Sequence, residues 1–261
     1  AGNGPVVCSA PGTITINAMG PTEVLNPDFD PNLLGSMKFV TRDYGFGTST
    51  GTVRIGNTVL TVTGWSNLSI TATVPGGTQT GQLSVTRGDN ARATETGLTV
   101  HVSTNGCANV RYVNAGAGTI QSAIDAASTG DLIIVNPGVY SENPILYKAV
   151  KLQGSGEGAT KIFANPSPAE RLAAWHSKIL SLLGNDPFVA NEAPGIMVLG
   201  NVPPYQFTAA HPSLIDGFHI LGAIMGGAIY VNTDVDSLTI SNNRIMGNQG
   251  NFAGGIAAGA V

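Results

Sequence analysis

The architecture of the second half of the chain is decided by residues 118–156, which read GTIQSAIDAASTGDLIIVNPGVYSENPILYKAVKLQGSG. This stretch predicts a helix over residues 118–127, because Thr119 can cap it, apolar side chains share one face, and Gly130 can end it. Short strands separated by Gly, Asn and Pro turns should follow at once. The apolar helical positions are Ile120, Ala123, Ile124 and Ala127, and the strands are 131–135, 139–140, 149–152 and 161–163.

Similar short segments recur further along the chain. The segment 216–220 is similar to 236–240, and the segment 226–229 recurs loosely as 253–256. A repeat of roughly 20–30 residues made of short β runs predicts a solenoid, because stacked coils bury apolar residues that a single coil cannot. Asn242-Asn243 and Gly247-Asn248 suit tight corners with left-handed backbone, and stacked Asn side chains could form an amide ladder.

Residues 118–156 resemble the N-terminal cap and first coil of the pectin-lyase-like class. Residues 215–256, which contain IDGFHILG, GGAIYV, LTISNNRIMGN and GGI, resemble later coils of that class. The resemblance covers about residues 110–261. It implies a right-handed parallel β-helix over residues 108–261, whose N-terminal capping helix covers unpaired strand edges. The chain is then expected to stop within a coil, as part of a large secreted bacterial β-helix repeat protein that continues beyond Val261.

A helical insertion is predicted at about residues 166–184. Residues 167–170, Ser-Pro-Ala-Glu, have the pattern of a capping box with Pro at the first helical position, and Gly184 can end the helix. This helix is expected to pack on the flank of the solenoid, and residues 185–212 are expected to form a long ordered loop. Its apolar face is Leu172, Trp175, Ile179, Leu182 and Leu183.

Residues 1–107 have an all-β pattern, with short predicted strands and frequent turns. The strands are 52–55, 59–62, 69–74, 81–86 and 98–102. The motifs Tyr44–Gly47, Val53–Gly56, Ile70–Pro75 and Gly81–Val85 follow the order seen in the IPT/TIG immunoglobulin-like domain, which the chain resembles over roughly residues 16–102. The resemblance implies an Ig-like β-sandwich with an N-terminal arm, used as a spacer or binding module in surface proteins. Residues 26–37 depart from the family pattern.

Cys8 and Cys107 are the two cysteines of the chain, and they bracket this first domain. Because the first and last strands of a small sandwich often end close together, a disulfide between them is expected. It would close a loop of about 100 residues and contribute up to roughly 4–5 kcal/mol in the chain-entropy model. The alternative is two free buried thiols in a reducing compartment.

The composition favours a secreted or cell-surface protein. Of 261 residues only 11% are charged, against a typical share of about 25%. The surface is therefore built from Thr, Ser, Asn and Gly, which suit short strands and turns. The net charge of −4 and the lack of a Lys/Arg run disfavour nucleic-acid binding. No segment approaches the roughly 18 apolar residues of a membrane span, and any signal peptide is expected to have been removed or omitted.

Few residues combine in a way that predicts chemistry. Asn232-Thr233-Asp234 resembles the first motif of polygalacturonase-type hydrolases, Asp234 and Asp236 would share a face on a strand, and Arg244 follows one coil later. The favoured interpretation is a solvated turn, with Asp216 and Asp236 as equivalent corner residues. The histidines do not form a metal-binding pattern. They are His101, His176, His211 and His219.

Two short motifs have structural interpretations that outweigh functional ones. Asp28, Asp30 and Asn32 alternate as in a calcium loop, but they lack the Gly and distal Glu of an EF-hand, so a rigid acidic turn is favoured. Arg87-Gly88-Asp89 spells an integrin-type tripeptide, and its residues suit a plain hairpin turn.

These patterns favour a non-catalytic scaffold, adhesion or glycan-binding module. No residue is assigned to catalysis, a cofactor or a metal. The expected partners are polysaccharide or other cell-surface components and further domains of the same chain, without nucleic acid or membrane insertion. Two alternatives stay open: a carbohydrate-active β-helix enzyme (lyase, hydrolase or epimerase) with its site partly outside this chain, and the scaffold of a multicopper-oxidase-type extracellular protein. Trp65 and Tyr230 are the candidate sugar-stacking rings, and both are expected to be packing residues.

Overall fold

The computed structural model describes residues 4–103, 106–188, 191–232 and 234–259. The chain is mainly β, with several parallel sheets and two helices among these residues. The described residues divide into two compact units: unit 1 contains those within 6–96 and 100–106, and unit 2 contains those within 4–5, 97–99 and 107–259. Within the described part of the chain, neither helix has the length and apolar character needed to cross a membrane.

Unit 1 has two larger antiparallel-rich sheets that share one apolar core. One sheet has the strand order β1-β10-β9-β5-β6 and the other has the order β2-β8-β7. Alternate residues of β5 and β8 point into the core, where Val53, Ile70 and Val74 have no exposed surface. The strands are β1 (Val6–Val7), β2 (Gly12–Asn17), β5 (Thr52–Ile55), β6 (Thr58–Val59), β7 (Thr61–Trp65), β8 (Ser69–Val74), β9 (Gly81–Thr86) and β10 (Leu98–Val102).

The expected strand over residues 59–62 is wrong, because the chain changes sheets there. β6 pairs with β5, whereas β7 pairs with β8 in the other sheet. Leu60 lies between them, is 4% exposed, and packs in the shared core. The burial of this one side chain therefore coincides with the crossing from one sheet to the other.

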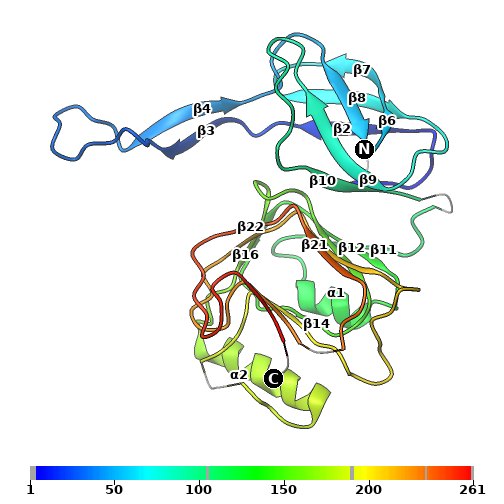
Figure 1. Ribbon diagram of the computed structural model, residues 1–261, viewed down its shortest axis with the longest axis vertical. Helices are drawn as coiled ribbons and strands as arrows, with labels where there is room; N and C mark the ends of the chain where they lie inside the picture. The colour runs from blue at the N-terminus through cyan, green and yellow to red at the C-terminus, as the bar shows by residue number, and fades with distance from the viewer. Residues whose placement is uncertain (1–3, 104–105, 189–190, 233, 260–261) are drawn as a thin grey trace. The chain divides into compact units, whose positions relative to one another are not determined.

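A hairpin projects from the rest of unit 1 as an arm (Figure 1). Its strands β3 (Gly20–Leu25) and β4 (Phe39–Tyr44) pair only with each other among the described strands, over six residue pairs. The sequence did not predict this arm, because both strands mix polar and apolar residues on both faces and neither face is buried. Residues 26–37, the segment that departs from the family pattern, form the tip of the arm.

The disulfide between Cys8 and Cys107 is confirmed. Cys8 follows β1, and Cys107 lies shortly after β10, the strand with which β1 pairs in parallel. Because these two strands are neighbours, the chain between the two cysteines begins and ends at one edge of the same sheet.

Unit 2 is built from three parallel sheets that the chain visits in turn. Their strand orders are β11-β12-β15-β18-β21, β13-β16-β19-β22 and β14-β17-β20-β23. Each circuit of the chain therefore adds one strand to each sheet, as the ribbon shows (Figure 1). The strands are β11 (Val110–Val113), β12 (Leu132–Val135), β13 (Gly138–Tyr140), β14 (Ile145–Leu146), β15 (Lys151–Gly154), β16 (Thr160–Phe163), β17 (Ile196–Val198), β18 (Ser213–Asp216), β19 (His219–Leu221), β20 (Ile229–Val231), β21 (Leu238–Ser241), β22 (Arg244–Ile245) and β23 (Ile256–Ala258).

Inward side chains of successive circuits stack in register to form the core of unit 2. In the first sheet, Ile133 pairs with Leu152, Leu152 with Ile215, and Ile215 with Ile240. The first three have no exposed surface, whereas Ile240 is only partly buried. Ile240 belongs to the last circuit that the structure describes, so it has a stacked neighbour on one side only.

One of the two predicted repeats is confirmed and the other is wrong. Ile229 pairs with Ile256, as the similarity of 226–229 to 253–256 predicts. In the other sheet, Asp216 pairs with Ser241, whereas Asp236 precedes β21, so the alignment of 216–220 with 236–240 is wrong. That alignment matched an isoleucine of β19 with one of β21, because each circuit places similar apolar residues in two neighbouring sheets.

Asparagines fasten the corners of unit 2 to the preceding circuit. Asn242 and Gly247 have positive φ angles of 53° and 64°, as expected for tight corners. The side chain of Asn243 accepts a hydrogen bond from Phe218 N (2.9 Å) and donates one to Ile215 O (2.8 Å). The corner amides therefore bind backbone groups. Of the residues described, Asn136 and Asn114 form the amide-to-amide contact, at 2.7 Å.

Helix α1 (Ile120–Ala126) covers the first circuit and contacts β11, β12 and β14. The predicted cap is confirmed, because the Thr119 hydroxyl accepts a hydrogen bond from Ser122 N (3.0 Å). Ile120 and Ile124 are fully buried. The helix ends earlier than expected, since Ala127 is already extended, and Gly130 (φ 88°) instead forms the turn before β12.

Helix α2 (Ala169–Leu183) is the predicted insertion, with one error at its start. Pro168 is the N-cap and provides no side-chain hydrogen bond, so the predicted capping box is wrong. Gly184 ends the helix with φ 76°, and Trp175 and Ile179 are buried, as predicted. The expected loop over residues 185–212 contains strand β17. This strand has only three residues and lies in a proline-rich stretch, so the sequence did not indicate it.

Candidate functional site

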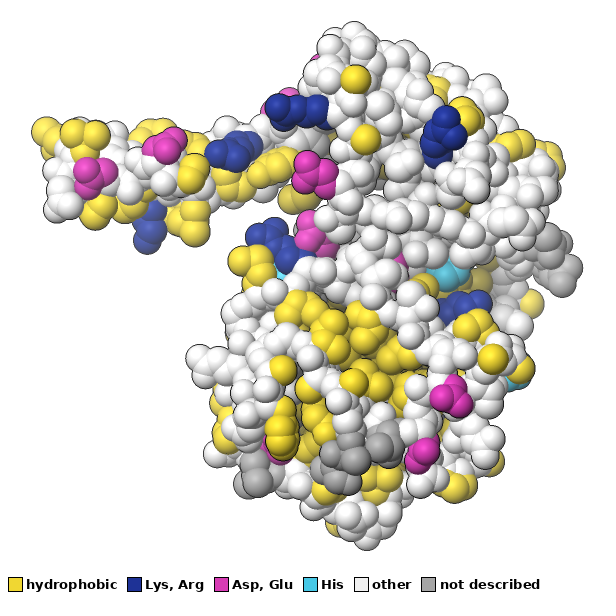
Figure 2. Space-filling view, in the orientation of Figure 1, with side chains coloured by type: hydrophobic (Ala, Val, Ile, Leu, Met, Phe, Trp, Pro, Cys, Tyr) yellow, Lys and Arg dark blue, Asp and Glu magenta, His cyan; other side chains and the backbone are white. Residues whose placement is uncertain are grey.

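A column of cationic side chains runs across three circuits of unit 2. Lys161 of β16 pairs with His219 of β19, and His219 pairs with Arg244 of β22. Lys161 and His219 are partly exposed and Arg244 is exposed. Figure 2 shows Lys/Arg and His side chains together over the region where Figure 1 labels β16 and β22. Because paired strands lie about 4.8 Å apart, the column offers one basic group at each strand spacing.

The electrostatics of the column centre on His219. Burial lowers the pKa of His219 below its usual 6.5, and the nearby Arg244 and Lys161 charges lower it further. The Glu157 carboxylate opposes this shift. His219 Nε2 is buried and has no hydrogen-bond partner among the residues described. At neutral pH the imidazole is therefore largely uncharged, and an anion placed on the column would favour its protonation.

An apolar column lies beside the cationic one on the same sheet. Phe163 pairs with Leu221, and Met246 directly follows β22 in the next circuit. Phe163 and Met246 are 38% and 51% exposed. A Cβ atom on Gly222 would lie 2.8 Å from the Phe163 ring, so glycine there lets the ring approach the backbone closely. The face therefore combines charge with an apolar strip alongside it.

This face can bind an extended anionic chain. Arginine and lysine donate charge-assisted hydrogen bonds to carboxylate, sulfate or phosphate oxygens. Lys161 and Arg244 place a cation on the first and third of these circuits, and His219 between them can become a third when an anion favours its protonation. The column therefore matches a ligand with spaced anionic groups, and the adjacent apolar strip can contact the uncharged parts of its backbone. The paired positions of the column contain no pair of carboxylates of the kind that glycoside hydrolysis requires.

The residues that the sequence associated with hydrolases do not lie on one strand or in one sheet. Asp234 has a positive φ of 59° and Asp236 lies outside the strands, so they do not share a strand face as expected. Between them, Val235 forms an isolated bridge with Phe207. Arg244 belongs to β22 in the sheet β13-β16-β19-β22, whereas both aspartates lie in the segment between β20 and β21. Thr233 lies outside the described residues.

Asp216 is a buried structural residue, so its expected role as a solvated corner is wrong. Its carboxylate has no exposed surface and accepts hydrogen bonds from Gln153 Nε2 (2.7 Å), Ser241 Oγ (2.8 Å) and Asn242 Nδ2 (2.6 Å). The partners come from the circuits on both sides, since Gln153, Asp216 and Ser241 are in register. The carboxylate therefore ties three circuits together.

The histidines and the short motifs take structural positions. His101 is buried in β10, His176 of α2 contacts the Asp186 carboxylate, and His211 lies in a loop. Within the part of the chain that the structure describes, no three His, Cys, Asp or Glu side chains are grouped as a metal site. Asp30 Oδ1 accepts from Asn32 N (2.8 Å), and Asp28 N donates to Asn26 Oδ1 (3.1 Å), as in a tight turn.

Three further candidates are held by local contacts. Arg87 pairs with Asp89 and also donates to Gly45 O (3.1 Å), so the tripeptide is tied to the backbone of unit 1. Trp65 donates to Gly47 O (3.1 Å) and packs edge-on against Phe46. Tyr230 is 8% exposed and packs against Phe188. Both rings are packing residues, as expected.

A polar cluster between the two helices was missed by the sequence analysis. The Asp125 carboxylate accepts from Lys178 Nζ (3.0 Å), Gln121 Nε2 (3.0 Å) and the Tyr147 hydroxyl (2.9 Å). Burial raises the pKa of Asp125, but these hydrogen bonds outweigh burial and leave the pKa below its usual value. Lys148, which is 3% exposed, donates to the Asp125 and Ala127 carbonyls. Since its groups bond one another, the cluster joins α2 to α1.

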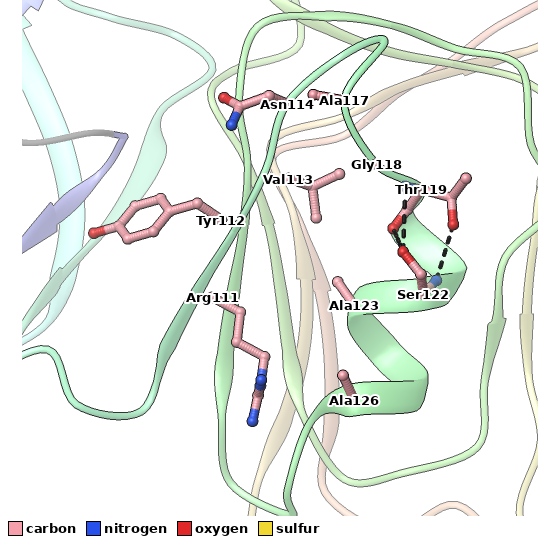
Figure 3. A pocket seen from close by; sticks show the side chains of 10 residues that line it. All are labelled: Arg111, Tyr112, Val113, Asn114, Ala117, Gly118, Thr119, Ser122, Ala123 and Ala126. Atoms are coloured by element: carbon pink, nitrogen blue, oxygen red, sulfur yellow. Dashed lines mark hydrogen bonds between the residues drawn. The ribbon is translucent and has the colours of Figure 1, made fainter.

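A pocket of about 270 Å³ lies between β11 and α1 (Figure 3). Its hydroxyl groups, on Thr119 and Ser122, already form the helix cap. Arg111 at one end pairs with Asp131 at 2.8 Å, and Tyr112 points away from the pocket in Figure 3. These polar groups are therefore engaged in holding the first circuit, and the cationic column remains the stronger candidate site.

Comparison with known proteins gives no match: no family model, no curated protein and no solved structure matches this chain.

Proposed function

We propose that this chain is part of a secreted or cell-surface scaffold that binds an acidic polysaccharide without cleaving it. In this proposal, unit 2 is a right-handed parallel β-helix of the pectin-lyase-like class, and unit 1 is an immunoglobulin-like sandwich of the IPT/TIG type that serves as a spacer. The observation that carries the binding role is the register of Lys161, His219 and Arg244 across three circuits.

Several features support the scaffold part of the proposal. The stacked inward residues and the asparagine-fastened corners describe a structure that grows by one circuit at a time. The confirmed disulfide favours an oxidising, extracellular compartment. A low share of charged residues, 11%, leaves the column as one of the few places where basic groups gather.

The ligand class follows from the chemistry of the face. A linear polysaccharide with a carboxylate or sulfate on its sugars repeats its charge along an extended chain, and the column repeats basic groups, with cations at Lys161 and Arg244 and a protonatable imidazole at His219 between them. Phe163 and Met246 give its sugar rings an apolar surface beside those charges. The carboxylates that a hydrolase would need, at Asp234 and Asp236, lie between β20 and β21. Neither of these strands belongs to the sheet that carries the column.

Calorimetric titration with polygalacturonate, alginate and chondroitin sulfate tests the proposal. Each polymer is compared with neutral dextran, and ultraviolet absorbance of unsaturated uronate is recorded in the same samples. The wild type should bind at least one acidic polymer and release no unsaturated product. The Lys161→Gln/Arg244→Gln variant should lose most of that binding, whereas Lys38→Gln/Arg54→Gln in unit 1 should keep it. Cleavage of any polymer, or equal binding by both variants, would refute the proposal.

A further inference from the structure

The arm of unit 1 has an unusual concentration of exposed apolar side chains. Seven of the seventeen large hydrophobic residues exposed within the described ranges fall between residues 19 and 44. Leu34 is completely exposed, at 102%, and Leu25 is 66% exposed. Figure 2 shows hydrophobic side chains along the length of the arm. The seven are Met19, Leu25, Leu33, Leu34, Met37, Phe39 and Tyr44.

The tip of the arm is ordered by its own polar groups. Asn26 N donates to Lys38 O (2.9 Å), and Asn26 Nδ2 donates to Met37 O (2.9 Å). Asp30 N donates to Ser36 Oγ (2.8 Å). Because the polar groups bond inward across the loop, the leucines are left on the outside, where burial by a partner would be favourable.

The base of the arm is fastened to the rest of unit 1. Asn67 Nδ2 donates to Asp43 Oδ2 (2.8 Å), and Asn67 Oδ1 accepts from Gly47 N (2.8 Å). A Cβ atom at Gly45 would lie 2.1 Å from Asn67 Oδ1, so this contact requires glycine there. The base of the arm is therefore held in place by these contacts, whereas the outer backbone edges of its two strands have no strand partner among the described residues.

The two edges of the arm are not equivalent. Among the described strands, β3 and β4 pair only with each other, so each has one open edge. β3 contains Pro21, which has no backbone N–H, whereas β4 has no proline. A two-stranded hairpin is marginal in water, and a sheet of three or more strands is stable. With one competent edge, self-pairing closes after two copies and does not continue into a fibre.

We propose that the arm joins two copies of this chain, with β4 of each copy pairing in antiparallel fashion across a two-fold axis. A four-stranded sheet in the order β3-β4-β4-β3 results. The symmetric registers that pair most of β4 are centred on Thr41 or on Arg42. A register centred on Arg42 places Arg42 opposite its own copy, which is unfavourable.

The register centred on Thr41 has no like charges directly opposite one another. It places Thr41 opposite Thr41, Val40 opposite Arg42, and Phe39 opposite Asp43 of the second copy. Lys38 then faces Tyr44, a pairing that allows a cation–π contact. The absence of like-charge repulsion therefore selects this register over the one centred on Arg42, and the same surface serves both copies. At the tip, the carboxylates of Asp28 and Asp30 disfavour an anionic lipid surface as the occupant.

Cysteine cross-linking of the full chain tests the proposal. Opposite residues of an antiparallel pair have Cα atoms about 4.5–5.5 Å apart, within the range of a disulfide. Thr41→Cys should therefore form a covalent dimer on mild oxidation. Val40→Cys lies opposite Arg42, so its two copies are beyond the roughly 7 Å limit and should cross-link poorly. Thr52→Cys, an exposed threonine on the interior strand β5, is the control away from the arm.

A second measurement keeps the test independent of cysteine chemistry. By sedimentation, the wild type should be a dimer with twice the mass of one chain. Thr41→Glu and Thr41→Arg should each raise the dissociation constant of the dimer several-fold, because like charges then face each other at the centre of the pairing. An equimolar mixture of the two variants should recover the dimer. A wild type that is monomeric at all concentrations, or cross-linking of Thr41→Cys no faster than that of Thr52→Cys, would overturn the proposal. Equal cross-linking of Val40→Cys would overturn the register and the proposal with it.

Discussion

At the scale of single residues, His219 is the member of the cationic column whose pKa is set by both burial and neighbouring charges. Its imidazole lies between Lys161 and Arg244 in the sheet, and Glu157 is the acidic group that faces it. Its Nε2 atom has no partner among the described residues. A group held in this way has a lowered pKa, and an anion bound beside it would raise that pKa.

The stability of the chain should fall with acid partly because of His219. Burial first, and then Arg244 and Lys161, lower the pKa of the folded-state imidazole below 6.5. The unfolded chain therefore binds more protons, and stability is lost as pH falls from 6.5 through the folded-state pKa. In urea titrations, His219→Gln should flatten the pH dependence over this range. His211→Gln, a loop histidine, is the control, and an unchanged slope in His219→Gln would contradict the assignment.

The corner amide of Asn243 should contribute measurable stability. It makes one hydrogen bond to each of two backbone groups of the preceding circuit, at Phe218 N and Ile215 O. Asn243→Ala leaves both without this partner, so we expect a loss of about 1–3 kcal/mol in the free energy of unfolding by urea. Asn57→Ala, in an exposed turn of unit 1, should change it by less than about 0.5 kcal/mol. Equal effects of the two changes would count against corner fastening.

At the scale of elements, α1 depends on a carboxylate from the first circuit. Glu142 Oε1 and Oε2 accept from Ile120 N (3.0 Å) and Gln121 N (3.2 Å). Burial raises the pKa of Glu142, because the two amides and Arg171 only partly offset the loss of solvent. The helix start is thus held both by its own Thr119 cap and by this distant side chain.

Glu142→Ala should loosen α1 from the end of the stack. Two helix amides lose their acceptor, so we expect about 1–3 kcal/mol of destabilisation and faster hydrogen exchange at Ile120 and Gln121. Glu142→Gln, which keeps one carbonyl acceptor, should lose less. Glu95→Ala, an exposed residue, is the control. Unchanged exchange at both amides in Glu142→Ala would show that the Thr119 cap alone holds the helix.

Elements with a clear apolar period were predictable, and those defined by distant partners were not. Strands β8, β9 and β10 fall where alternation placed them, and Gly184 ends α2 as its position suggested. β14 and β17 are too short to show a period. The cationic column was invisible in the sequence, because the insertion makes the spacing from Lys161 to His219 more than twice the spacing from His219 to Arg244.

At the scale of the whole molecule, the disulfide closes the long loop that contains most of unit 1. Cys8→Ala/Cys107→Ala should lower the free energy of unfolding by about 2–5 kcal/mol, since the loop of about 100 residues becomes unconstrained in the unfolded chain. Thermal unfolding followed by circular dichroism measures this. Reduction of the wild type should reproduce the shift, and reduction of the double variant should have no further effect. A double variant as stable as the oxidised wild type would show that the disulfide does not stabilise the fold and that the pairing of β1 with β10 is enough to hold the two ends of unit 1 together.

Successive circuits of unit 2 stack in register, and both the proposed scaffold and the cationic column depend on this stacking. Nuclear Overhauser contacts between isoleucine methyl groups measure this directly. Ile162 pairs with Ile220, and Ile220 with Ile245, on the same sheet as the column. We predict methyl contacts between Ile162 and Ile220 and between Ile220 and Ile245. Absence of both contacts in a folded sample would contradict the stacking and remove the basis for the column.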